Sequence, residues 1–267
     1  MGIMVLATLL IPILVSLVVG ILVNFTCDTL PWTRRLTRPV CHSCSHPLGL
    51  ADYLLNRPCP ACGRRPSWRY WAVMGSYLAL SLYTWLFPSR PLGYPVGMLL
   101  LAWLGAVVVM DLEFHVVLHE VSAVGAVLGL AIGVWSRGVL PTLVGGITGF
   151  AIMLAFYGLG IVYSRWLSRR RKPSSSVAAE SQDSAGEDDE VALGFGDVNL
   201  SGILGFILGW PAIIAGLVTG ILAAGAISLL TILGMVLMKK YRPSVAIPYA
   251  PFLVLGAAIY LYGLWAL

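Results

Sequence analysis

Charged residues are scarce in this sequence. Lysine, arginine, aspartate and glutamate make up 11% of the 267 residues, whereas about a quarter of an average soluble domain is charged. Hydrophobic residues make up 58%, and the mean hydropathy is +0.87. The composition therefore excludes an ordinary soluble globular protein and predicts an all-α polytopic membrane protein.

Several patterns that would point to a particular chemistry are also missing. The segment that begins His119-Glu120 lacks the second histidine of HExxH, which argues against a zinc protease of that kind. No GxGxxG loop is present, and no internal repeat is evident. The formal net charge is +5, but membrane proteins use basic residues to set their topology. We therefore expect a lipid bilayer and no nucleic acid as partner.

Long apolar stretches account for most of the chain. A membrane-spanning helix needs about 20 apolar residues, which predicts about eight transmembrane helices, at 3–23, 71–87, 95–111, 116–134, 139–164, 198–210, 211–237 and 246–266. The sixth stretch is short, and the third and fourth are separated only by the region around Asp111, so a count of seven is also open. The first stretch lacks a basic segment before it and is interpreted as a spanning helix, not a cleavable signal peptide.

The distribution of basic residues predicts the orientation. All of them except Arg90 and Arg137 lie after the first, fifth and seventh stretches, in 25–70, 165–193 and 238–245. Basic loops stay in the cytosol, so these three loops are predicted to be cytosolic and both termini to lie outside the cytosol. On this topology Asp111 and Asp197 share the cytosolic face.

Composition divides the chain into three parts. We expect a first transmembrane helix at 1–24, a cytosolic cysteine module at 25–70 and a transmembrane core at 71–267. Within the core, 165–193 is first basic, then serine-rich, then acidic, and is predicted to be a disordered loop. Gly125, Gly129 and Gly133 recur every four residues, which is typical of close helix packing.

Four of the five cysteines form two CxxC pairs, Cys41/Cys44 and Cys59/Cys62. This spacing is typical of a four-thiolate zinc site. The alternative is a pair of disulfides, which a cytosolic location disfavours. His42 and His46 are close enough to replace a thiolate. A site with four protein ligands leaves none free for catalysis, so we expect a structural Zn²⁺ that folds a segment too small to hold a core.

Two carboxylates stand at the ends of apolar stretches, Asp111 and Asp197. Ionisable groups at such positions are costly and usually functional. Two carboxylates held close together can share a proton and act as general base and general acid, which is the chemistry of an aspartic protease. Gly194 and Gly196 would shape such a site by allowing close approach of backbone. The structural alternatives are a helix N-cap for Asp197 and a solvated helix end for Asp111.

Two non-proteolytic functions remain open at this level. Asp111, His115 and His119 are four residues apart and would share one face of a continuous helix, which could bind a divalent metal ion. The chain could then be a metal-handling membrane protein. A scaffold organised by the zinc module is the other alternative.

These features together resemble the type IV prepilin peptidases, a family of GxGD membrane aspartic proteases. Gly194-Phe-Gly-Asp197 looks like the family's GxGD motif, and Asp111 occupies the place of its first catalytic aspartate. Gly20–Asn24 with Leu30-Pro31, the double CxxC loop, and Ile247–Leu253 resemble other family segments in the same order. The resemblance covers nearly the whole chain.

The resemblance implies a specific activity for this chain. Asp111 and Asp197 would be the catalytic pair that cleaves the basic leader from type IV prepilins or pseudopilins at the cytosolic face of a prokaryotic inner membrane. Long family members also methylate the new N-terminus with S-adenosylmethionine, and this second activity is implied by the resemblance alone. Neither the particular substrate nor the oligomeric state is predicted.

Overall fold

The computed structural model describes residues 2–34, 37–41, 43–64, 68–89, 92–115, 118–170, 194–238 and 248–263. Within these ranges the chain forms helices and no strand, with one isolated β-bridge between Val40 and Pro47. The helices are α1 (Gly2–Thr33), α2 (Leu50–Leu54), α3 (Trp68–Leu86), α4 (Gly93–Phe114), α5 (His119–Arg137), α6 (Val139–Arg170), α7 (Phe195–Leu208), α8 (Ala212–Leu237) and α9 (Ala250–Tyr262). The predicted all-α class is confirmed.

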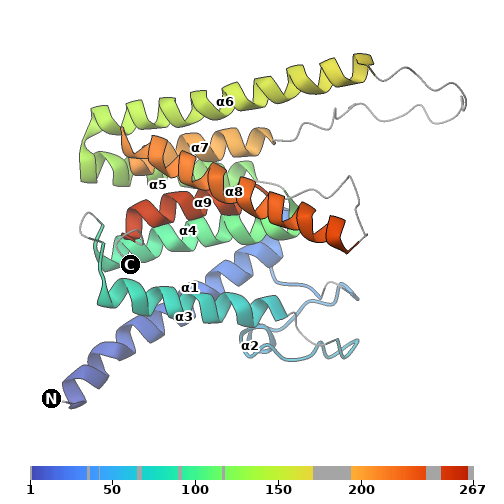
Figure 1. The fold of residues 1–267 in the computed structure, drawn as a ribbon. Coiled ribbons are helices and arrows are strands. Elements are labelled where there is room, and N and C mark those ends of the chain that lie inside the picture. The colour runs from blue at the N-terminus through green and yellow to red at the C-terminus, as the bar shows by residue number, and fades with distance from the viewer. Residues whose placement is uncertain are drawn as a thin grey trace, which may run out of the picture.

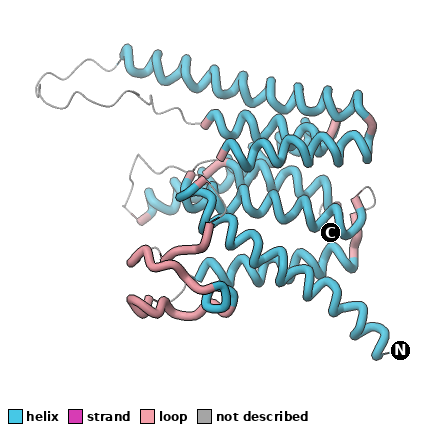
Figure 2. The backbone as a smooth tube through the Cα atoms, turned by 180° about the vertical axis from the view of Figure 1, so that it is seen from behind, coloured by secondary structure: helices cyan, strands magenta, loops and turns pink. Residues whose placement is uncertain are grey.

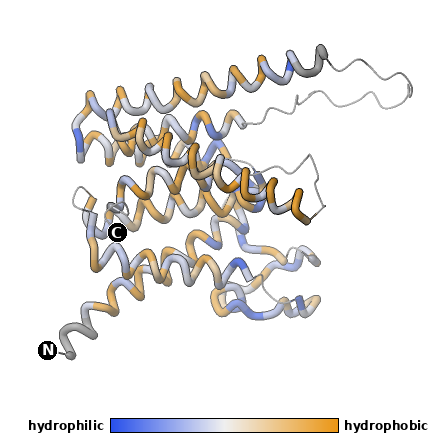
Figure 3. The backbone as a smooth tube through the Cα atoms, in the orientation of Figure 1, coloured by the Kyte–Doolittle hydropathy of each residue, from blue (hydrophilic) through white to orange (hydrophobic). Residues whose placement is uncertain are grey.

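The long helices run side by side and alternate in direction (Figure 1). Both termini lie at one end of this bundle, and the loops of the cysteine module project from the other end, as the view from behind also shows (Figure 2). Those loops are among the most hydrophilic parts of the chain, whereas the helices are largely apolar (Figure 3). α4 ends and α7 begins at the module end, so the two segments that carry Asp111 and Asp197 meet on one side.

Five described helices are long and apolar enough to cross a membrane: Thr8–Pro31 of α1, α4, α5, Val139–Trp166 of α6, and α8. They make the chain a multi-pass membrane protein. The predicted count of eight is not reached among the described helices, because α7 and α9 have 14 and 13 residues and α3 carries many Tyr, Ser and Thr side chains. At 1.5 Å per residue, α7 is about 21 Å long and shorter than the roughly 30 Å hydrocarbon core.

α1 and α6 extend furthest past their predicted ends. α1 continues beyond residue 24 to Thr33, because its polar side chains are satisfied inside the helix: Asn24 Nδ2 donates to the carbonyl of Gly20 (3.0 Å) and Thr29 Oγ1 to that of Phe25 (2.8 Å). α6 continues to Arg170 and so takes up the start of the loop predicted to be disordered at 165–193. The rest of that predicted loop, 171–193, lies outside the described residues.

The most buried part of the bundle is formed by α4 and α7. The fully buried large side chains come mainly from these two helices, including Leu100, Leu104 and Met110 on α4 and Leu200 and Leu204 on α7. α7 is covered by α5, α6, α8 and α9, whereas α4 contacts α1, α3, α5 and α9. The central position of these two helices explains how the segments carrying the two aspartates become buried.

Glycines allow α7 to be enclosed so closely. A Cβ atom added to Gly205 would lie 2.3 Å from the carbonyl oxygen of Gly145 on α6, and one added to Gly133 on α5 would lie 2.2 Å from that of Phe206. Side chains cannot fit at such distances, so the backbones are in direct contact. The predicted packing role of the glycines spaced four residues apart on α5 is confirmed, since Gly129 also contacts α7.

Replacing Gly205 by alanine is expected to destabilise the protein, because the new Cβ would contact backbone atoms that cannot rotate away. Overpacking of this kind typically costs about 1–3 kcal/mol. Gly158 on α6 is the matched control, since nothing lies within 4 Å of an added Cβ, and alanine there should be neutral or slightly stabilising. Thermal unfolding in detergent measures both; equal unfolding temperatures for the two variants would contradict the close α6–α7 contact.

Candidate active site and metal centre

Asp111 lies in the last turns of α4 and is only 6% exposed. Its Oδ2 accepts a hydrogen bond from the backbone N–H of Ala250, the first residue of α9, at 3.2 Å. The first N–H groups of a helix have no partner within the helix, so a carboxylate is a suitable acceptor there. The interpretation of Asp111 as a solvated helix end is therefore wrong.

Asp197 lies in the first turn of α7 and is 8% exposed. The N-cap residue of α7 is Gly194, whose carbonyl accepts the backbone N–H of Asp197 (3.0 Å) and whose own N–H interacts with the Asp197 carboxylate. The interpretation of Asp197 as an N-cap is therefore wrong as well. Asp197 lies three residues after the N-cap residue, and its burial beside a second carboxyl group is not needed for capping; such groups are often functional.

The structure brings the two aspartates together. The side chains of Asp111 and Asp197 are close enough to interact electrostatically, and Tyr249 interacts with Asp197 in the same way. α9 packs against both α4 and α7, so its N-terminus, with Tyr249 and Ala250, forms a third part of the site. This contribution was not predicted, because nearly every residue type carries a backbone N–H group and alanine at position 250 is not distinctive. The one sequence signal was the pair of prolines at 248 and 251, which are typical of a helix start.

The two glycines of the GxGD segment have ordinary backbone conformations. Gly194 has φ −75° and ψ 147°, and Gly196 lies within α7. A Cβ added to Gly194 would meet other atoms only at ordinary contact distance, the nearest being Asp197 Oδ2 at 3.8 Å. Gly194 therefore leaves space beside the Asp197 carboxylate, and the part it plays in shaping a site stays a prediction.

The predicted metal-binding face of Asp111, His115 and His119 is not formed. α4 ends at Phe114, His115 follows in a left-handed conformation (φ 53°), and α5 begins at His119. The three residues therefore do not share one helical face, which was the basis of that prediction. Among the described residues, the cysteines at 41, 44, 59 and 62 are the one group of side chains arranged to hold a metal ion.

The four cysteine sulfurs form a compact cluster. All four Sγ atoms lie within 4.8 Å of one another, and the Cys41–Cys62 and Cys44–Cys59 distances are both 3.6 Å. A tetrahedral Zn²⁺ with bonds of 2.3 Å places its sulfur ligands about 3.8 Å apart, so these positions fit zinc. Disulfide sulfurs are about 2.05 Å apart, and all five cysteines are free. The disulfide alternative is therefore wrong, and the cluster could hold a metal ion such as zinc.

The two CxxC segments have matching backbones. In each, the carbonyl of the first cysteine accepts an N–H from four residues later, Ser45 to Cys41 and Gly63 to Cys59, both at 2.8 Å. Ser45 and Gly63 also both adopt positive φ, 55° and 68°. This repeated turn directs both cysteines of each pair to one side, so that the two pairs face each other.

Backbone N–H groups also tune the cluster. Those of Ser43 and Cys44 donate to the sulfur of Cys41 and lower the pKa of this thiol to about 6. A thiolate is the form that binds a metal. The imidazole of His46 does not belong to the metal-binding cluster, although the backbone carbonyl of His46 accepts a hydrogen bond from the N–H of Cys41 (2.9 Å). His42 lies outside the described residues.

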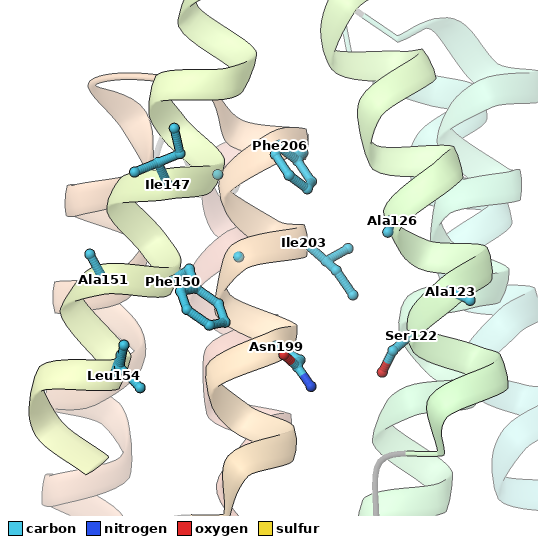
Figure 4. A pocket seen from close by; sticks show the side chains of 12 residues that line it. Ser122, Ala123, Ala126, Ile147, Phe150, Ala151, Leu154, Asn199, Ile203 and Phe206 are labelled. Carbon is cyan, nitrogen blue, oxygen red and sulfur yellow. The ribbon is translucent and has the colours of Figure 1, made fainter. Parts of the chain in front are cut away.

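An apolar groove of about 540 Å³ lies between α5, α6 and α7 (Figure 4). Phe150, Ile203 and Phe206 line it, and the polar side chains of Asn199 and Ser122 point into it at one end. Successive helical residues are about 100° apart, so the Asn199 face of α7 points about 200° away from Asp197. The groove is therefore on the side of α7 opposite the aspartate pair and is separate from it.

Comparison with known proteins yields no relatives. No protein-family model, no curated protein and no solved structure matches the chain. The resemblance to prepilin peptidases therefore rests on the motifs described above, and the geometry has to support a function directly.

Proposed function

We propose that this chain is a membrane aspartic endopeptidase that removes the leader peptide of type IV prepilins or pseudopilins at the cytosolic face of a prokaryotic inner membrane. The observation that carries the proposal is the pair of buried carboxylates, Asp111 and Asp197, which come from two different helices and interact electrostatically. The cysteine cluster would hold a structural Zn²⁺. The termini would lie outside the cytosol, at the end of the bundle opposite the cluster.

The two carboxyl groups would divide the work of acid and base as a pair. Each interacts with a backbone N–H, Asp111 with that of Ala250 and Asp197 with that of Gly194, so the contacts favour a carboxylate at both positions and one negative charge belongs to the pair. The ionised member would take a proton from the attacking water, and the protonated member would polarise the scissile carbonyl. No covalent intermediate is required. The implied methylation with S-adenosylmethionine gains no support from the described residues, so the proposal is limited to the peptidase.

The test is leader cleavage in membranes that contain a prepilin and either wild type, Asp111→Asn or Asp197→Asn. Both variants should leave the leader attached, because asparagine keeps the shape of the side chain but cannot transfer the proton. Asp52→Asn in the cysteine module is the matched control. Asp52 is partly exposed, and its ion pair with the exposed Arg57 is long, at 4.0 Å. Exposed ion pairs of this kind contribute little to stability.

Two outcomes would overturn the proposal. A wild type that cleaves none of several prepilins, or aspartate variants that cleave as well as wild type, would be incompatible with an aspartic peptidase. Function retained in both aspartate variants would favour the scaffold instead. Dependence on His115 but not on Asp197 would favour the metal-handling alternative.

A further inference from the structure

An arginine outside the proposed catalytic pair joins three helices at the module end of the bundle. The guanidinium of Arg69, at the start of α3, donates to Asp28 on α1 through Nη2 and to Glu113 on α4 through Nη1. The side chains of Arg69 and Asp28 are only 18% and 15% exposed, and that of Glu113 is 33% exposed. Partly buried charge-assisted hydrogen bonds of this kind are stronger than exposed ion pairs.

The same network reaches the cysteine module. The hydroxyl of Tyr53, on α2, donates to Oδ2 of Asp28 at 2.6 Å. Its ring packs edge-on against Phe25 and Tyr70, and the hydroxyl of Tyr70 donates to the carbonyl of Leu54 at 3.1 Å. α2 is therefore held against the ends of α1 and α3. Of the side chains that make these contacts, Asp28 binds Arg69 directly and Tyr70 is the neighbour of Arg69 in the chain.

The position of α2 makes this connection depend on the cysteine cluster. α2 has five residues and lies between Cys44 and Cys59. Such a short helix is not stable by itself. A metal ion bound by all four cysteines would fix both ends of the segment that carries Tyr53, so the placement of Tyr53 follows from the closed cluster.

At its other end the network acts on the turn that carries Asp111. Asp111 and Glu113 are two residues apart, so they point about 200° apart around α4. Ala250 holds Asp111 from one side, and Arg69 holds Glu113 from nearly the opposite side. α4 ends one residue later, at Phe114, where the last carbonyls have no helical partners. The two contacts together fix the rotation of this last turn about the helix axis.

We propose that Arg69 is a positioning residue that couples the metal state of the cysteine cluster to the orientation of Asp111. This inference rests on the proposed peptidase function. A catalytic group displaced by about 1 Å can lose roughly a hundredfold in rate, so a contact at the opposite side of the same turn is sufficient to control turnover. Arg69 itself does not touch the substrate.

The first experiment measures kcat and KM for leader cleavage by zinc-loaded wild type, Arg69→Gln, Glu113→Gln and the double variant. We expect kcat to fall about tenfold or more with KM within about twofold, because substrate contacts are unchanged and only the geometry of Asp111 is altered. The kcat of the double variant should be no lower than that of Arg69→Gln, since both substitutions break the same contact between Arg69 and Glu113. Arg57→Gln, which removes an exposed arginine of the same module, should match wild type.

The second experiment uses reciprocity and does not depend on peptidase activity. If the cluster supports the end of α4, then loosening that end must weaken metal binding by the same coupling free energy. Competition with a chelator should give an apparent zinc Kd at least about fivefold weaker for Glu113→Gln than for wild type or Arg57→Gln. Glu113 lies outside the module, so the loss of a ligand cannot explain such a change.

The outcomes separate this inference from the proposed function. Full kcat in Arg69→Gln and Glu113→Gln, or an unchanged zinc Kd in Glu113→Gln, would overturn the coupling. Thermal unfolding identifies a variant that has failed to fold. If Arg69→Gln is such a variant, Glu113→Gln decides the result, because it removes the charge that Arg69 pairs with on α4 and leaves the Arg69–Asp28 ion pair in place. A wild type without cleavage would overturn the peptidase, and the zinc Kd would still decide whether the cluster and α4 are coupled.

Discussion

Asparagine at Asp111, at Asp197 and at both positions together is expected to reduce leader cleavage to one common residual level. Each single variant should lose about 10³-fold or more in kcat, because general acid and general base catalysis each contribute about 10²–10⁴-fold. The double variant should lose no more than the worse of the two. Groups that work as a unit are strongly non-additive in this way.

The physical basis of this expectation is the interaction of two buried carboxyl groups. One proton shared between two such groups belongs to the pair and not to either residue. Removing one carboxyl group removes the base or the acid and also changes the ionisation of the other. The remaining group then cannot carry out its own step, so the second substitution costs nothing more.

Initial rates on a purified prepilin in detergent or reconstituted membranes measure this effect. Each variant should also be compared with wild type in thermal unfolding and zinc content, so that a loss of rate reflects chemistry and not folding. Losses that multiply in the double variant would mean that Asp111 and Asp197 act independently. That result would be incompatible with a shared-proton pair.

Removal of zinc from the purified protein is expected to unfold the cysteine module and leave the transmembrane helices in place. Structural zinc sites contribute apparent binding free energies of about 10–16 kcal/mol at neutral pH in small zinc-binding peptides. The module has little apolar core to replace that contribution. Cys44→Ser should have the same effect as a chelator, because three thiolates leave the tetrahedral site incomplete.

Limited trypsin digestion measures the state of the module directly. Arg64 is exposed and lies two residues after Cys62, so cleavage after Arg64 should be slow with zinc bound and fast without it. Cys27→Ala is the matched control, because Cys27 is buried beside Ala106, away from the cluster, and should retain about one zinc per chain. Equal digestion rates with and without metal would mean that the module folds without zinc.

Features that depend on residue type and period were predictable from the sequence. The double CxxC spacing led to the clustered thiols, and the glycines at 125, 129 and 133 led to close packing, because in both cases a local pattern determines the contact. The meeting of Asp111 and Asp197 at one end of the bundle followed from counting helices and locating basic loops. That inference needed only alternation of direction, which the structure also has.

Features that depend on where a helix stops, or on backbone atoms, were not predictable. The ladder of Asp111, His115 and His119 required a continuous helix, and the left-handed conformation at His115 ends it. The hydrogen bond from Ala250 to Asp111 uses an N–H that nearly every residue has. The Arg69 network joins residues 28, 53, 69 and 113 across four helices, and no periodicity relates such positions.

The length of α7 has a consequence for hydration. With its far end, Leu208, level with one edge of the hydrocarbon layer, a helix of about 21 Å leaves roughly 9 Å of a 30 Å layer above its first residue, Phe195, and roughly 12 Å above Asp197. In the proposed peptidase, hydrolysis would consume a water molecule at each turnover, and this water would have to cross that depth from the module end, through a locally thinned bilayer or a wetted depression. Substrate turnover would therefore respond to bilayer thickness, and thicker lipids would slow it without any change in the protein.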